Sequence, residues 1–295
     1  MSTFKQLLAP TDFSEYAMMA VRRAAMIAVQ QQAKLDLMHV LSSGTLKSLQ
    51  EFEFLNISQE SEAQQLAEAE HQLAALAADI KRETGITPAT QIKAGNVLDE
   101  VIAAMKAADM LVLGARGTSP LRDLLVGSMA MRLLGKCNLP VLVVNGAPTQ
   151  IYRRVLVPVD FFPHSREALK LALQIAPDAD ITVINAFQVP FKGKLALSGA
   201  AKEQLQRYRT QAQQLASQNI QELIQEVAGE SHQIKHAVKQ ADPAVFILEQ
   251  ATELEADLIV IGKRGQSLME GMLLGSVTRH ILVNVKCDVL AVHPA

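Results

Sequence analysis

The sequence has few cysteines, little net charge and no long apolar run. Its 295 residues include two cysteines, neither at a spacing typical of metal sites or redox motifs, which favours a reducing compartment. The formal net charge is −2, so the basic surface of a nucleic-acid-binding protein is not expected. A membrane-spanning helix needs about 18 consecutive apolar residues, and no such run occurs. The start, MSTFKQLLAPTD, has neither the apolar region nor the cleavage site of a signal peptide. These features predict a cytoplasmic protein.

The chain repeats itself. Residues 114–128 read GARGTSPLRDLLVGS and residues 262–276 read GKRGQSLMEGMLLGS, with seven of fifteen aligned positions identical at an offset of 148. The same offset pairs Asp12 with Asp160. A period of this length is the size of a domain, and two copies are too few for a solenoid. The pattern therefore indicates a tandem duplication.

Each copy alternates short apolar strands with longer helical segments, in a chain that is 49% apolar and 20% charged and therefore globular. The expected strands are residues 5–10, 34–40, 89–94, 110–114 and 140–144, and then 153–159, 180–187, 232–238, 257–262 and 288–292. The expected helices include residues 15–31, 60–84, 98–107, 124–136 and 202–227. This alternation predicts a parallel sheet covered on both faces. We expect two doubly wound α/β domains, residues 1–147 and 151–295, joined by a linker at residues 145–152.

The glycine-rich segment follows the fourth strand of each copy and leads into a helix. Missing side chains let an anion approach backbone N–H groups, and a helix N-terminus favours negative charge. Asp12 and Asp160 follow the first strands. In a doubly wound sheet the ligand site lies beyond the carboxyl ends of the strands, where the strand order reverses. If strands one and four are neighbours, each aspartate faces its glycine loop. The arrangement predicts a nucleotide pocket in each copy.

Other phosphate-binding motifs do not fit. A dinucleotide fingerprint should follow the first strand, where the chain reads PTDFS and PVDFF, and the Walker pattern does not occur. Simpler interpretations stay open: the glycines could serve turns and close packing, and the aspartates could form turns. Arg116, Lys263 and Arg264 either offset phosphate charge or are solvated loop residues. No combination of nucleophile, base and orienting group is apparent, so we assign no catalytic residue and no metal ligand.

The glycine motif, the strand before it and the openings LLAPTD and VLVPVD resemble the universal stress protein family in tandem form, over essentially the whole chain. The resemblance implies a Rossmann-like five-stranded parallel sheet with strand order 3-2-1-4-5 in each domain. It also implies ATP as a ligand, since one branch of the family binds ATP through this motif. By position, the implied nucleotide-binding residues are Asp12, Val40, Gly114, Arg116, Gly117, Gly127 and Ser128 in the first copy, and Asp160, Phe187, Gly262, Lys263, Arg264, Gly265, Gly275, Ser276, Val277 and Thr278 in the second.

The resemblance leads us to expect a regulator of the stress response that binds ATP, with Mg²⁺ held through the phosphates, and acts on an unidentified protein partner. A nucleotide-free adaptor and a slow ATP hydrolase are the alternatives. The last strands are expected to pair the two halves as an internal pseudo-dimer, and a homodimer stays open. We expect tighter binding in the second half, because Lys263 and Thr278 stand where the first half has Ala115 and Ala130.

Overall fold

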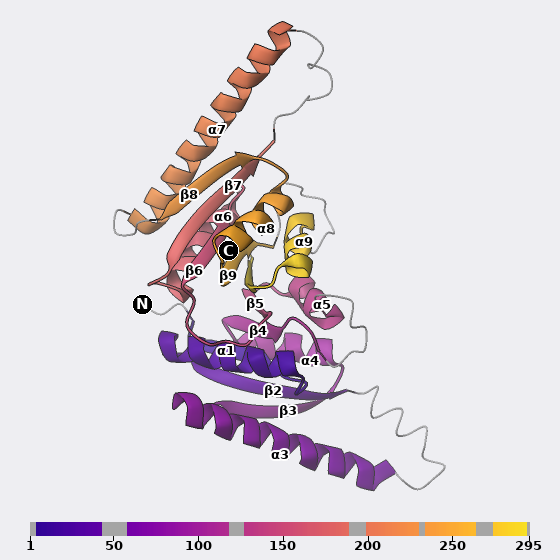
Figure 1. The fold of residues 1–295 in the computed structure, drawn as a ribbon. Coiled ribbons are helices and arrows are strands. Elements are labelled where there is room, and N and C mark those ends of the chain that lie inside the picture. Colours follow the sequence, from indigo (N-terminus) through magenta and orange to yellow (C-terminus); the bar gives the residue numbers. More distant parts are fainter. Residues whose placement is uncertain are drawn as a thin grey trace. The chain divides into compact units, whose positions relative to one another are not determined.

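The computed structural model describes residues 4–42, 58–117, 127–188, 199–229, 234–263 and 274–293. The chain divides into two compact units, Met1–Ile151 (unit 1) and Tyr152–Ala295 (unit 2). Each is an α/β unit whose elements can be followed along the chain in Figure 1.

Unit 1 contains five parallel strands in the order β3-β2-β1-β4-β5. The strands are β1 (Gln6–Pro10), β2 (Lys34–Ser42), β3 (Ala89–Gly95), β4 (Met110–Gly114) and β5 (Val141–Val144). Its helices are α1 (Glu15–Gln31), α3 (Ser58–Thr84), α4 (Val97–Ala104) and α5 (Ser128–Lys136), with a 3₁₀ turn, η2, at Met105–Ala107. Helix α1 packs against α3, and α4 packs against α5.

Unit 2 repeats this arrangement with the strand order β8-β7-β6-β9-β10, again all parallel. Its strands are β6 (Arg154–Pro158), β7 (Asp180–Phe187), β8 (Lys235–Gln240), β9 (Leu258–Gly262) and β10 (Asp288–Val292). Its helices are α6 (Pro163–Ile175), α7 (Gly199–Ala228), α8 (Pro243–Glu253) and α9 (Ser276–Asn284). The predicted fold, with strand order 3-2-1-4-5 in each half, is confirmed.

The central strands form the core of each unit. Side chains along β1 and β4, and along their counterparts β6 and β9, are almost fully buried, as expected for strands covered by helices on both faces. The outer strands β3 and β8 are more exposed and carry lysines such as Lys93 and Lys235. Charged residues of this kind protect a sheet edge against unwanted pairing.

Asp109 and Asp257 hold equivalent positions in the two units, just before β4 and β9. Each carboxylate accepts two backbone N–H groups from the start of the neighbouring first strand, at 2.7 and 2.9 Å in unit 1 and at 2.8 and 3.1 Å in unit 2. A carboxylate that accepts two such bonds fixes the register of the strands it joins. The repeat therefore extends to the contacts that hold the sheet together.

Several expected boundaries differ from those observed. The expected helix 98–107 stops at Ala104 and continues as the η2 turn. Helix α5 begins at Ser128, whereas the expected start at residue 124 lies outside the described residues. Strand β8 begins at Lys235, and residues 230–233 also lie outside the described part. None of the described helices has both the length and the apolar character needed to cross a membrane.

Candidate functional site

A cavity of about 510 Å³ opens at the carboxyl ends of β1, β2 and β4 in unit 1. This is the point where the strand order reverses, the usual ligand site of a doubly wound sheet, and the volume is typical of small-molecule sites. All the residues predicted for the first copy line it: Asp12, Val40, Gly114, Arg116, Gly117, Gly127 and Ser128.

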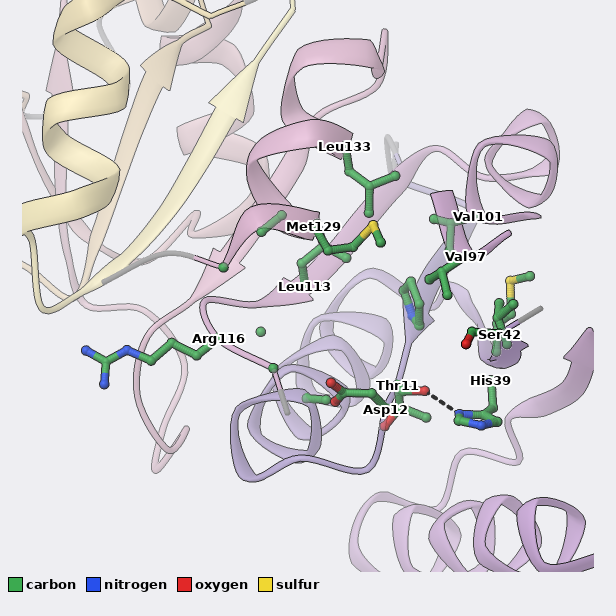
Figure 2. A pocket seen from close by; sticks show the side chains of 18 of the residues that line it. Thr11, Asp12, His39, Ser42, Val97, Val101, Leu113, Arg116, Met129 and Leu133 are labelled. Carbon is green, nitrogen blue, oxygen red and sulfur yellow. Dashed lines mark hydrogen bonds between the residues drawn. The ribbon is translucent and has the colours of Figure 1, made fainter. Parts of the chain in front are cut away.

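The walls of this cavity differ in character, as Figure 2 shows. Leu113, Met129 and Leu133 supply apolar surface on one side, and Thr11 and Asp12 lie along the opposite edge. The valines of α4 add to the apolar wall. Such a cavity can hold a molecule with a flat apolar part and a separate polar part.

Asp12 faces the glycine loop. Its Oδ2 atom lies 2.7 Å from the position that a Cβ atom would occupy on Gly117, so a side chain at residue 117 would displace the carboxylate. Its Oδ1 accepts the N–H of Ser14 at 3.1 Å, which makes an Asx turn. The residue between them, Phe13, has a φ of 59°, and the equivalent Phe161 has a φ of 65°. Left-handed backbone at a bulky residue is uncommon, and it occurs here in both units next to the aspartate.

The carbonyl before each aspartate is held from the second strand. His39 Nδ1 donates to the Thr11 carbonyl at 2.8 Å, since a carbonyl oxygen can only accept. In unit 2, Asn185 donates its amide N–H to the Val159 carbonyl, also at 2.8 Å. His39 and Asn185 are therefore structural equivalents that hold the turn after the first strand.

The equivalence of the second strands corrects the alignment of Val40 with Phe187 that was made from the sequence. Pro10 pairs with Met38 in unit 1, and Pro158 pairs with Ile184 in unit 2. Counting two residues onward, the counterpart of Val40 is Ala186, not the Phe187 chosen from the sequence. The second strands of the two copies differ in offset from the rest of the repeat, and no motif in either strand reveals the difference. Phe187 still lines the unit 2 cavity.

The glycines serve different purposes. A Cβ atom on Gly114 would lie 2.6 Å from the backbone carbon of Tyr16, and one on Gly262 would lie 2.8 Å from Cδ2 of His164. These two glycines therefore allow the end of the fourth strand to pack against the first helix of its unit, in line with the packing interpretation. Around Gly127, by contrast, a Cβ atom would meet nothing closer than 3.7 Å.

Gly127 and Gly275 precede the helices α5 and α9. Both have ordinary extended backbone, and neither provides a side-chain cap. Their own N–H groups donate to the carbonyls of Ala115 and Lys263, each at 2.7 Å, so these two N–H groups are already in use. In the described part of each site, the first turn of the helix, beginning at Ser128 and Ser276, offers backbone donors for an anion.

Of the predicted cationic residues, Arg116 and Lys263 are described, and neither directs its charged group into a cavity. The Arg116 guanidinium lies over the ring of Tyr16, 5.2 Å from its centroid, and points away from the cavity in Figure 2. Lys263 is only 1% exposed and is not among the described residues that line the unit 2 cavity. Arg264 and Gly265 lie outside the described residues. In the described part of the site, helix termini rather than cationic side chains favour an anion.

The cavity of unit 2 has a volume of about 620 Å³ and lies at the equivalent place. The predicted residues that line it are Asp160, Phe187, Gly262, Gly275, Ser276, Val277 and Thr278. The Asp160 Oδ1 atom accepts the hydroxyl of Ser165 at 2.8 Å, a contact for which no sequence signal existed because Ser165 belongs to no motif.

Comparison with known proteins shows the family of the chain. The sequence model of the universal stress protein family matches residues 3–145 and again residues 151–293. The chain belongs to the universal stress protein family. It is 30% identical over 294 residues to a universal stress protein of Mycolicibacterium smegmatis, and the alignment covers 98% of this chain and 97% of that protein. A universal stress protein of Synechocystis is 27% identical over 154 residues, or 48% of this chain and 97% of that protein.

Solved structures agree on the fold. The crystal structure of a universal stress protein from Archaeoglobus fulgidus is similar with a TM-score of 0.72 and 17% identity, covering 98% of both chains. A putative universal stress protein from Pseudomonas aeruginosa gives a TM-score of 0.66 at 19% identity, covering 99% of this chain and 94% of that one. The resemblance expected from the sequence, to a tandem universal stress protein, is confirmed.

Proposed function

We propose that both cavities bind adenine nucleotides, with ATP as the ligand, and that the chain is a ligand-dependent regulator in the stress response. One observation carries this proposal: an aspartate and an uncapped helix N-terminus line the same cavity in each unit, Asp12 with Ser128 and Asp160 with Ser276. A carboxylate accepts hydrogen bonds from sugar hydroxyls, and a helix N-terminus favours phosphate.

The apolar wall of the cavity would hold the base of the nucleotide. In unit 1, Val97, Val101 and Leu133 line the cavity together with the carboxyl end of β2. A purine ring is flat and largely apolar on its faces, so it would fit between such side chains. The edge of the ring would then meet backbone groups of β2 around Val40, which line the same cavity. Mg²⁺ would be held through the phosphates, because no group of three or more His, Cys, Asp or Glu residues in the described part of the chain could hold a metal ion.

A regulatory role fits the site better than catalysis does. Hydrolysis of ATP needs a group that positions the attacking water near the terminal phosphate. Asp12 and Asp160 would be used at the ribose, at the other end of the ligand. We therefore propose binding without efficient turnover. The nucleotide-free adaptor and the slow hydrolase remain the alternatives to be tested.

The first test identifies the ligand. The purified chain is denatured and the supernatant is analysed for nucleotides, and ATP is titrated into nucleotide-free protein by calorimetry. Two binding events, or ATP in the supernatant, support the proposal. Absence of both supports the adaptor. Phosphate release that continues well beyond the molar amount of protein supports the hydrolase.

Matched blocking variants then assign each binding event to its cavity. Gly127→Phe and Gly275→Phe add a large side chain where the backbone already has a conformation that any residue can adopt. Each variant should fold and should lose one binding event, leaving the other unchanged. If both variants keep both events, ATP does not bind in these cavities.

A further inference from the structure

Ser165 contacts the unit 2 aspartate in two ways. Its Oγ accepts the backbone N–H of Asp160 at 3.0 Å and donates its hydroxyl hydrogen to Asp160 Oδ1 at 2.8 Å. The serine lies in the first turn of α6 and is only 3% exposed. The same Oδ1 also accepts the N–H of Phe162 at 3.2 Å. Two donors from the start of α6 thus hold one oxygen of the carboxylate.

The equivalent position in unit 1 is Ala17, which has no hydroxyl. There the serine stands at the helix start instead: Ser14 is the N-cap of α1 and accepts the N–H of Ala17 at 3.3 Å. In unit 2 the N-cap is Phe162, which makes no side-chain cap bond. A serine therefore caps the helix in unit 1, whereas in unit 2 a serine in the first helical turn contacts the aspartate.

The other carboxylate oxygen of Asp160, Oδ2, is not used by these two hydrogen bonds. Both hydrogen bonds converge on Oδ1, and no described residue donates to Oδ2. Asp160 is half-buried and lines the cavity. A carboxylate held in this way cannot rotate without breaking two hydrogen bonds, so its orientation is fixed before a ligand arrives. Fixing a group in its binding orientation raises affinity because less freedom is lost on binding.

We infer that Ser165 is a positioning residue that sets the Asp160 carboxylate to accept a ribose hydroxyl. This inference rests on the proposed nucleotide function and deepens it. Through Ser165, unit 2 distinguishes nucleotides that carry ribose hydroxyls from those that lack them. We expect the effect to be specific to the ribose hydroxyls, because in the proposed binding mode the phosphates lie at α9 and the base at β7, away from the Ser165–Asp160 hydrogen bond.

The test compares ATP with 2′,3′-dideoxy-ATP in the full chain carrying Gly127→Phe, so that binding in unit 2 is measured alone. Calorimetry gives the dissociation constant of each nucleotide, with Ser165 intact and with Ser165→Ala. Alanine occupies the equivalent helix position in unit 1, so the fold accommodates it. We expect the dissociation constant of the dideoxy nucleotide divided by that of ATP to fall by about threefold to tenfold in Ser165→Ala. The change should come from weaker binding of ATP, with the affinity for the dideoxy nucleotide nearly unchanged.

The outcomes separate the two claims. If neither nucleotide binds to the Gly127→Phe chain with Ser165 intact, the proposed function fails for unit 2. If ATP binds and the ratio is the same with and without Ser165, the inference about Ser165 is overturned. An equal loss of affinity for both nucleotides also overturns it, because that result would mean that Ser165 only supports the local structure.

Discussion

Thr278 donates its hydroxyl to the carbonyl oxygen of Gly262 at 2.7 Å. The side chain is 3% exposed, and the bond ties the first turn of α9 to the end of β9. A hydroxyl has one hydrogen to donate, so Thr278 cannot at the same time donate to a phosphate. In this structure the hydroxyl holds the end of β9, so the extra ligand contact expected from the sequence would require this hydrogen bond to break.

Replacing Thr278 by valine tests this role. The two side chains have nearly the same shape, but valine leaves the Gly262 carbonyl without its hydroxyl donor. We expect the free energy of unfolding to fall by about 1–3 kcal/mol, the cost of an unsatisfied buried acceptor. Chemical denaturation would measure the change. A variant with unchanged stability and much weaker ATP binding would instead restore the ligand role.

The expectation of tighter binding in unit 2 now depends on different groups. It began from Thr278 and Lys263, but the Thr278 hydroxyl donates to Gly262, and Lys263 is 1% exposed and is not among the described residues that line the cavity. The fixed carboxylate of Asp160 is the remaining reason to expect it. Comparing ATP affinity in the Gly127→Phe and Gly275→Phe chains measures the difference between the two sites directly.

Two glycines in unit 1, Gly114 and Gly127, should differ in how much the same substitution lowers the stability. Gly114→Ala places a Cβ atom 2.6 Å from the Tyr16 backbone, and backbone cannot move aside cheaply, so we expect destabilisation of about 1–3 kcal/mol. Gly127→Ala meets nothing closer than 3.7 Å and should leave the stability almost unchanged. Thermal unfolding of both variants provides the comparison. Equal melting temperatures would contradict the assignment of Gly114 to packing.

Much of this fold could be predicted because the sequence patterns of strands, helices and glycine motif occur in both copies. The alternation of strands and helices and the bounds of α1 follow from apolar periodicity and from two copies that agree. The strand order comes from the resemblance to the family, and with it the placement of Asp12 beside Gly117. The directions of side chains could not be predicted in this way. Arg116 and Lys263 both follow the first motif glycine closely, yet one lies over Tyr16 and the other is buried, because tertiary packing decides which way a loop side chain turns.

The contact between Ser165 and Asp160 also could not be predicted from the sequence. A serine in the first turn of a helix is usual, and only the structure shows that its hydroxyl reaches Asp160. The pairing of the two halves through their last strands stays a prediction, as do the partner and the homodimer.

The reciprocal substitution in unit 1, Ala17→Ser, tests the role proposed for Ser165. Ala17 lines the cavity and is 5% exposed, so Ala17→Ser adds a hydroxyl at the position from which Ser165 reaches Asp160. In the full chain carrying Gly275→Phe, we expect the preference for ATP over 2′,3′-dideoxy-ATP to increase by about threefold to tenfold. Calorimetry on both nucleotides measures it. A decrease in this preference would show that a hydroxyl here competes with the ribose.

The last prediction concerns Cys287, whose pKa is raised from 9.0 to about 12, first by burial and then by the negative charge of Asp288. Because the folded pKa lies above the unfolded value, the folded state holds the thiol proton more tightly. Stability from this group is fully present below about pH 9 and is lost as the pH rises towards 12. The slope for one proton is about 1.4 kcal/mol per pH unit.

Cys287→Ala removes this contribution. Other groups also titrate at alkaline pH, so the measurement is the difference in unfolding free energy between the native chain and the variant, followed from about pH 8 to about pH 11. We expect the native chain to lose stability more steeply than the variant above about pH 9. The half-buried thiol should also react slowly with iodoacetamide near neutral pH, because the raised pKa leaves little of the reactive thiolate. Parallel pH profiles together with rapid alkylation of Cys287 would show that its thiol ionises as readily as an exposed one.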